Sequence, residues 1–197
     1  YFKNIFFQSM PITLSICAYS FSAAIVFTYV GTSGEFATAG YGAASRIEQV
    51  LFLPVLGINT AIISIISQNF GAKNFIRIKE TYFTALKYAL FIMVIAGIVI
   101  FLSADIVTRI FSNNQEVINY GTRYLKISAF VLPAYPIFFI SNGFFMSLKK
   151  AENAMISNMF RNLLVPISVF YLAKYITADF NTFFWLWASF NWTYSLL

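Results

Sequence analysis

Six long apolar stretches dominate this sequence and restrict its fold more than any other feature. They are residues 10–30, 50–67, 88–104, 127–148, 163–176 and 182–197. The core of a bilayer is about 30 Å thick, and a helix needs about 20 residues, within a range of about 17–25, to cross it. The first four stretches reach that length once flanking apolar residues are counted, whereas the last two are shorter. The chain is therefore expected to cross a membrane several times.

The length of the stretches also decides between helices and strands. Strands run for about 4–8 residues, and the strands of a lipid-facing barrel alternate between polar and apolar side chains. These stretches are longer and do not alternate. Because lipid offers no hydrogen-bond partners, backbone groups must be satisfied within each segment. We predict an all-α integral membrane protein in which residues 1–197 form a six-transmembrane-helix bundle.

The charge content supports the same class. Hydrophobic residues make up 59% of the chain and charged residues 10%, whereas soluble domains carry about 25% charged residues. The net charge is +6, but Lys and Arg are scattered between the apolar stretches and form no basic stripe of the kind that binds nucleic acid. The expected partner is the lipid bilayer, with no nucleic acid.

The basic residues between the stretches predict an orientation, because cytoplasmic loops carry more Lys and Arg. One side has Lys3, Lys73, Arg77, Lys79, Lys87, Lys149, Lys150 and Arg161, and the other has Arg46, Arg109, Arg123, Lys126 and Lys174. The first side is therefore expected to face the cytoplasm, with both ends of this segment there and the protein in the inner or plasma membrane. The start at Tyr1 and the end within an apolar stretch suggest a piece of a longer protein.

Charged residues near the second stretch are the first candidates for a functional site. Arg46 and Glu48 lie at its outer end, and a charge at a helix centre costs about 2.5–3.5 kcal/mol. Residues two apart do not face each other on a helix, so the two are not a simple ion pair. One interpretation places both at the outer interface, with Arg46 reaching water. The other points Glu48 into a water-filled cavity, where it binds a cation or a proton.

Prolines predict breaks in two of the helices. Pro54 removes an internal hydrogen bond and Gly57 follows it, a pattern typical of broken helices that line transport sites, although a packing kink produces the same pattern. Pro133 and Pro136 predict a bent or discontinuous helix within residues 127–148.

Three amide side chains complete the candidates for a substrate or ion path. Asn59 follows the predicted break, and Gln68 lies at the inner end of its helix, where capping is the default explanation. Asn142 is expected either to bond a neighbouring helix or to contact substrate. With one cysteine and no histidine, and without a phosphate loop, zinc spacing or nucleophile elbow, the sequence predicts no catalytic residue, no bound metal and no enzyme.

The sequence GYGAASRIEQVLFLPVLGINTAIISIISQNFGAKN, residues 40–74, resembles the signature of the multidrug and toxic compound extrusion (MATE) family. That pattern joins a small-residue stretch and Arg-x-Glu to Pro and Gly in mid-helix, and it ends in Gln-Asn-x-Gly-Ala. Residues 112–145 resemble the family's loop and following helix more loosely. The resemblance implies twelve helices in two bundles around a cavity, with this chain as the second half and an N-terminal six-helix half as its missing partner.

The resemblance also implies a secondary efflux transporter, an antiporter that exports cationic or amphipathic organic compounds in exchange for Na⁺ or H⁺ and needs no other cofactor. Some members carry coupling acids in the helices that match residues 10–30 and 127–148. Both stretches lack an acid here, and Tyr19 lies near the first of these positions. Two alternatives remain. One is a lipid-linked saccharide flippase of the same superfamily, which should show several intramembrane arginines, and the other is a non-transporting membrane subunit.

Overall fold

The chain is helical throughout the part that the structure, a computed structural model, describes, which is residues 2–176 and 179–196. The elements in order are α1 (Phe2–Gly31), α2 (Glu35–Gly71), α3 (Phe75–Phe111), α4 (Gln115–Val131), α5 (Ala134–Ser147), α6 (Ala151–Met159), the π-helical turn η1 (Phe160–Leu164), α7 (Val165–Tyr175) and α8 (Phe180–Leu196). The predicted all-α fold is confirmed.

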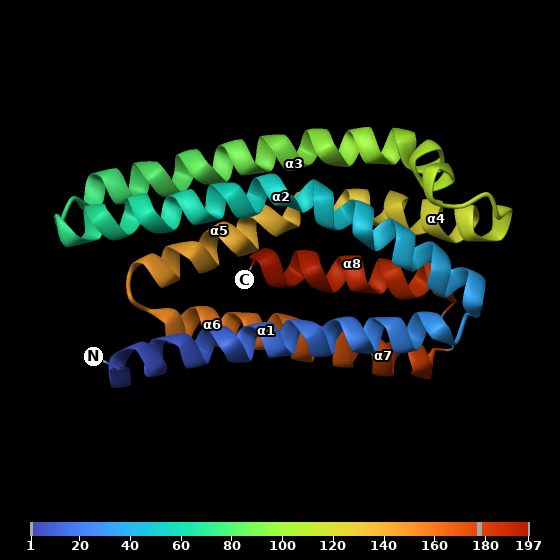
Figure 1. Cartoon of the computed structure of the whole chain (residues 1–197), viewed down its shortest axis with the longest axis horizontal. Coiled ribbons are helices and arrows are strands. Elements are labelled where there is room, and N and C mark those ends of the chain that lie inside the picture. Colours follow the sequence, from blue (N-terminus) through green and yellow to red (C-terminus); the bar gives the residue numbers. More distant parts are fainter. Residues whose placement is uncertain (1, 177–178, 197) are drawn as a thin grey trace.

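The helices lie roughly parallel to the long axis of the molecule and form two groups (Figure 1). The first group contains α2, α3, α4 and α5, which pack against one another, and the second contains α1, α6, η1 and α7. Helix α8 lies between the groups, where it contacts α4 and α5 on one side and α7 on the other. The interior of the bundle is therefore the space where the two groups face each other across α8.

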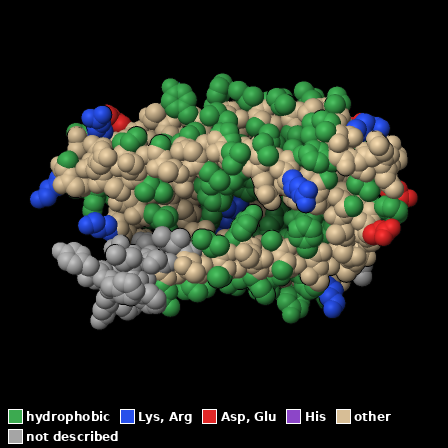
Figure 2. Space-filling model, viewed as in Figure 1, with side chains coloured by type: hydrophobic (Ala, Val, Ile, Leu, Met, Phe, Trp, Pro, Cys, Tyr) green, Lys and Arg blue, Asp and Glu red, His purple; other side chains and the backbone are tan. Residues whose placement is uncertain are grey.

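The helices have the length and the surface expected of a membrane protein. Four described segments are long and apolar enough to span a bilayer, and the α4–α5 pair is a fifth if it counts as one bent span. Helix α8 has 17 described residues, one fewer than the 18 taken here as the minimum length of a membrane-spanning helix. Figure 2 shows hydrophobic side chains across the visible face, with most charged side chains toward the two ends of the molecule. Such an apolar belt is expected to lie in lipid.

The two predicted breaks differ. Helices α4 and α5 meet at 53°, and Pro133 lies between them. Pro136 lies in the first turn of α5, where backbone N–H groups have no partner within the helix, so its missing N–H costs no hydrogen bond. Helix α2, in contrast, continues without interruption through Pro54 and Gly57. Of the two alternatives at Pro54, the continuous helix agrees with a packing kink and not with an interruption, because one lost hydrogen bond bends a helix without ending it when both halves are packed. Figure 1 shows α2 changing direction along its length.

The fifth span begins earlier than predicted, since helix runs from Ala151 rather than from residue 163. The π-helical turn η1 directly precedes Pro166, whose ring would clash with the carbonyl four residues before it in a regular α-helix. Arg161 lies in this turn and is buried inside the bundle rather than near an end of a span. Without Arg161, the predicted count of basic residues on the two sides of the membrane changes from eight against five to seven against five.

Small residues bring the helices of the first group into backbone contact. A Cβ atom added at Gly40 of α2 would lie 2.7 Å from the carbonyl oxygen of Val117 in α4, and one added at Gly121 would meet Thr108 of α3. A Cβ atom at Gly97 of α3 would lie 2.8 Å from the carbonyl oxygen of Ala129. We call Gly40, Gly97, Thr108, Gly121 and Ala129 the small-residue seam. Such close approach is typical of helix packing in membranes.

Candidate functional site

Glu48 of α2 projects into the interior, where α4 and α5 meet. Its carboxylate accepts hydrogen bonds from the hydroxyl groups of Tyr124 in α4 and Tyr135 in α5, the latter at 2.6 Å. The two tyrosines lie on either side of the Pro133 bend, which turns both phenols toward one carboxylate. The bend therefore positions the hydrogen-bond donors of Glu48.

Aromatic rings surround this carboxylate site. The Tyr41 ring packs edge-on against Tyr124 with ring centroids 4.9 Å apart, and it stacks on Phe184 of α8 at 5.5 Å. Tyr124 also contacts Phe184, at 4.8 Å. Tyr41, Tyr124 and Phe184 are all buried. The ring contacts fix the position of Tyr124, one of the two donors to Glu48, while the Glu48 side chain itself is half-buried.

A buried arginine lies on the opposite side of the interior. Arg161 is 8% exposed, and its Nε and Nη2 groups donate to Oδ1 of Asn191 in α8 at 3.2 and 3.0 Å. The guanidinium also lies 4.1 Å from the ring centroid of Phe138 and 5.6 Å from that of Phe139. The η1 turn thus places a positive charge among aromatic rings of α5.

Tyr135 connects the two charged groups. Its hydroxyl donates to Glu48, while its ring centroid lies 5.2 Å from the guanidinium of Arg161. We call Glu48, Tyr124, Tyr135, Arg161 and Asn191 the interior polar cluster. It draws on α2, α4, α5, η1 and α8, so residues far apart in the sequence form it only in the folded bundle.

The interior is accessible from one face of the molecule. Figure 2 shows a hollow between the two helix groups, with a basic side chain at the bottom of it. Tyr19 of α1 is 58% exposed, and α1 contains no acidic residue.

Of the predicted charged pair, only Glu48 points inward. Arg46 is exposed on α2, as expected for residues two apart on a helix. Gln68 is also exposed, near the end of α2. Neither residue joins the interior polar cluster.

The predicted asparagines lie elsewhere, where α2, α5 and α6 approach one another. Asn142 is buried, donates to the carbonyl oxygen of Phe138 at 2.9 Å and accepts from Asn158 of α6 at 3.0 Å. Oδ1 of Asn59 is buried without a hydrogen-bond partner and lies where a Cβ atom at position 143 would be 2.0 Å away. Asn142 bonds a neighbouring helix, and Gly143 leaves room for Asn59.

Sequence reasoning missed Tyr124, Tyr135, Arg161 and Asn191. The tyrosines carried no signal, because tyrosine occurs both in the interior and at the interfaces of membrane proteins. Arg161 was assigned to a loop because the predicted span began two residues after it. A span extended to Ala151, through the moderately apolar α6 segment, would have placed Arg161 within the helix.

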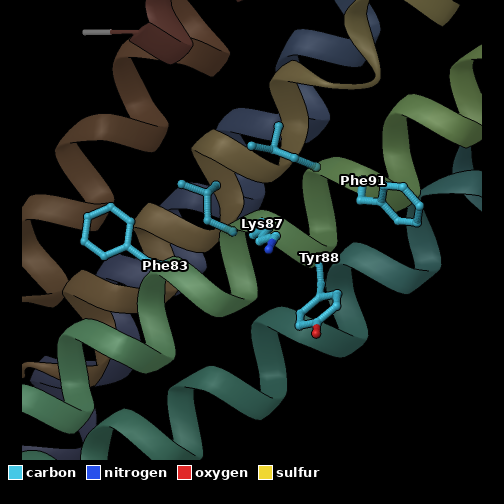
Figure 3. Close-up of a pocket in the computed structure, with 6 residues that line it drawn as sticks. Phe83, Lys87, Tyr88 and Phe91 are labelled. Atoms are coloured by element: carbon cyan, nitrogen blue, oxygen red, sulfur yellow. The ribbon is translucent and has the colours of Figure 1, made fainter.

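A surface depression on α3 is a weaker candidate. It is lined by Phe83, Leu86, Lys87, Tyr88, Leu90 and Phe91. All six belong to neighbouring turns of one helix, as Figure 3 shows for the four labelled residues. A shallow, mostly apolar depression of this kind faces lipid in a membrane helix and offers no path through the bundle.

An all-helical bundle with an apolar belt and a charged interior defines a multi-pass integral membrane protein. The MatE family model matches residues 11–172. The chain belongs to the MATE family of multidrug efflux transporters.

Curated relatives agree with this assignment. The chain is 26% identical over 161 residues to a probable multidrug resistance protein, YpnP, of Bacillus subtilis (strain 168), which covers 82% of this chain and 34% of that protein. It is 23% identical over 154 residues to the multidrug export protein MepA of Staphylococcus haemolyticus, with 78% and 34% covered. It is 22% identical over 153 residues to an FAD transporter of Shewanella oneidensis, again with 78% and 34% covered.

Solved structures share the fold. A MATE crystal structure in complex with MaL6 superposes with a TM-score of 0.89 at 21% identity and covers 95% of this chain and 43% of that one. A MOP superfamily transporter from Pyrococcus furiosus gives 0.87 at 22% identity, with 95% and 42% covered. The chain thus spans about a third of its curated relatives and somewhat under half of the solved chains, consistent with half of a MATE-type transporter.

Proposed function

We propose that this chain is the second six-helix bundle of a secondary active efflux transporter. The transporter is an antiporter that exports cationic or amphipathic organic compounds in exchange for H⁺ or Na⁺. Glu48 carries this proposal, because it is an interior carboxylate held by hydroxyl groups from both sides of a bent helix pair. Interior ionisable groups in membrane helices commonly mark ion and substrate pathways.

Glu48 is suited to coupling because its charge and its helix contacts change together. When it is ionised, both carboxylate oxygens accept hydrogen bonds, one from α4 and one from α5. A proton or a bound cation cancels the charge and weakens at least one of these bonds. The balance between two arrangements of the α4–α5 bend then depends on the coupling ion, as alternating access requires.

The donors around Glu48 favour a proton over Na⁺ as the coupling ion. Both phenols direct their O–H groups at the carboxylate, whereas a sodium ion needs oxygen lone pairs directed at it. A proton can join one carboxylate oxygen while the other still accepts a hydrogen bond.

The relatives support transport of organic compounds, since two are named for multidrug resistance or export and one for FAD. Because the chain spans about a third of these proteins, the proposed partner is an N-terminal six-helix half, which would complete the central cavity. We also propose that both ends of this segment face the cytoplasm, as the corrected excess of seven basic residues over five favours.

Transport by the full-length protein in proteoliposomes tests the proposal. We expect ethidium to move against its gradient when an inward or outward pH gradient is imposed, and Glu48→Gln to abolish this movement. Glu80→Gln is the matched control, because Glu80 is exposed on α3. A sodium gradient without a pH gradient separates the two coupling ions. Ethidium movement that ignores both gradients, or that survives Glu48→Gln unchanged, would refute the proposal.

One observation favours the flippase alternative more than the sequence did. Arg161 is a charged group inside a helix that crosses the bundle, and a flippase would use such groups to hold a lipid-linked phosphate. A single interior arginine is fewer than the several expected. Transfer of a fluorescent lipid-linked saccharide across the same vesicles, without ethidium transport, would identify a flippase. Vesicles that move neither compound would identify a non-transporting subunit.

A further inference from the structure

Arg161 carries a charge that the proposed coupling reaction does not use. Among residues 2–176 and 179–196, the hydrogen-bond acceptor of its guanidinium is Asn191, a neutral amide. Within the described residues, the ion pair that forms joins Arg109 to Asp105 at an exposed site. Arg161 forms no direct ion pair with Glu48. Among the described residues, the guanidinium is therefore buried without a direct ion pair, and the nearby carboxylate of Glu48 accepts hydrogen bonds from Tyr124 and Tyr135 instead.

The geometry leaves one edge of the guanidinium available. Asn191 Oδ1 accepts from Nε and Nη2, which form the side edge of the planar group. The end edge, formed by Nη1 and the second N–H of Nη2, has no acceptor among the described residues. An arginine presents five N–H donors in fixed directions, and a pair of parallel donors matches the two oxygens of a carboxylate or phosphate.

The aromatic rings explain how the charge is tolerated but do not replace an anion. Rings of Tyr135, Phe138 and Phe139 lie 4.1–5.6 Å from the guanidinium and cover its faces. Contacts of this kind stabilise a cation, and no nitrogen of Arg161 is among the buried polar atoms without a partner in the described residues, so its free N–H groups are accessible to a ligand. The faces are thus occupied by protein, and the end edge is free for an anion.

We propose that Arg161 is an oxyanion-binding site that takes a single carboxylate or phosphate group carried on a flat aromatic compound. The oxyanion pairs with the end edge of the guanidinium, and the aromatic body packs beside the rings of Tyr135, Phe138 and Phe139. Its role as a site for transported substrate rests on the proposed function, whereas binding itself does not.

Equilibrium binding to the full-length protein in nanodiscs, with no ion gradient, tests the site. The probes are 2-naphthoate, its uncharged counterpart 2-naphthamide and the cation 2-naphthylmethylammonium. We expect 2-naphthoate to bind at least tenfold more tightly than the amide. Arg161→Gln should remove this preference, and Arg161→Lys should keep part of it, since lysine retains the charge but loses the paired donors. Arg46→Gln is the matched control, because Arg46 is exposed on α2.

A second variant keeps the arginine and guards against misfolding. Asn191→Asp places a carboxylate of nearly the same shape on the side edge of Arg161, where it neutralises the charge from within. We expect this variant to fold at least as well as the parent protein and to lose the preference for 2-naphthoate tenfold or more. Because binding is measured without an ion gradient, failure of this site and failure of proton coupling are distinguishable.

The source of the oxyanion is tested by the lipid composition. In nanodiscs that contain phosphatidylcholine alone, no anionic lipid competes, and we expect 2-naphthoate to bind with its full affinity. Competition that increases with added phosphatidylglycerol would show that the guanidinium takes the phosphate of a lipid headgroup, and it would overturn the assignment of an aromatic carrier. Equal binding of acid and amide by the parent protein would overturn the proposal, and it would indicate that a carboxylate in the other half of the transporter balances Arg161. Unchanged 2-naphthoate binding by both Arg161→Gln and Asn191→Asp would overturn it as well.

Discussion

The small-residue seam and the interior polar cluster hold the bundle together in different ways. In the seam, glycines let the backbones of α2, α3 and α4 touch, so no side chain separates them. In the cluster, large side chains from both helix groups meet through hydrogen bonds and ring contacts. The seam should therefore be sensitive to a single added methyl group, and the cluster to the loss of a single polar atom.

The largest expected effect is in the seam, for Gly40→Ala. The new Cβ atom would lie 2.7 Å from the Val117 carbonyl oxygen and 2.9 Å from the Gly121 nitrogen, and neither backbone atom can move without displacing α4. We expect a loss of about 3 kcal/mol in unfolding free energy, the upper end of ordinary overpacking. Unfolding of the full-length protein by SDS in mixed micelles measures it.

Gly42→Ala provides the control for the seam, because it lies two residues away in α2 and a Cβ atom there meets nothing within 4 Å. We expect no loss, and a gain of up to about 1 kcal/mol, since alanine favours helix over glycine. Equal effects of the two substitutions would mean that backbone contact at Gly40 does not stabilise the bundle.

A smaller effect is expected in the cluster, for Tyr135→Phe. The ring that covers Arg161 remains, but the hydroxyl that donates to Glu48 at 2.6 Å is lost. Hydrogen bonds to charged groups contribute about 1.5–3 kcal/mol, so we expect a loss of about 2 kcal/mol in the same unfolding experiment. Tyr171→Phe is the control, since Tyr171 is 68% exposed. If both substitutions prove equally mild, Glu48 is held by Tyr124 alone.

The helical class and the interior polar cluster differ in how far the sequence predicted them. The all-α class followed from the lengths of the apolar stretches, because lipid leaves the backbone few alternatives. The asymmetry between Pro54 and Pro133 did not follow. Each proline removes one hydrogen bond, and whether a helix bends or ends there depends on packing by neighbouring helices.

The cluster was predicted only at Glu48. A carboxylate near an apolar stretch is costly, and that cost identified it. Its donors Tyr124 and Tyr135 come from positions 76 and 87 residues away, which no spacing rule connects. Arg161 was missed because its depth depends on where the fifth helix begins. Polar residues are thus recognisable one at a time, whereas their partners are fixed by tertiary packing.

Asp179, a carboxylate outside both regions, sharpens the contrast with Glu48. It precedes α8 and caps it: the hydroxyl and backbone N–H of Thr182 donate to its carboxylate, the latter at 3.0 Å, and together they lower the pKa of Asp179. A lowered pKa means that the contribution to stability is complete above the unfolded value of about 3.9 and disappears as the pH falls through the folded value.

Two substitutions test the cap. We expect Asp179→Ala to cost about 1 kcal/mol at neutral pH, the usual value of a helix cap. Asp179→Asn should keep the cap, because asparagine accepts the same hydrogen bond, and should remove this contribution to the loss of stability below about pH 4. Unfolding measured between pH 3 and 7 compares the three proteins. An identical pH dependence in Asp179→Asn would exclude Asp179 as a contributor.

The smallest effect is expected for Asp105→Asn, in the ion pair at the end of α3. Asp105 and Arg109 are four residues apart, their atoms Oδ2 and Nε are 2.7 Å apart, and each side chain is 51% exposed. Exposed pairs of this spacing contribute little to stability, and salt screens them. We expect a small loss of unfolding free energy in low salt and none in about 1 M salt. A loss as large as that of Asp179→Ala that persists in salt would place this end of α3 away from water. The pair would then resemble the interior polar cluster, and the contrast between buried and exposed carboxylates would fail at this position.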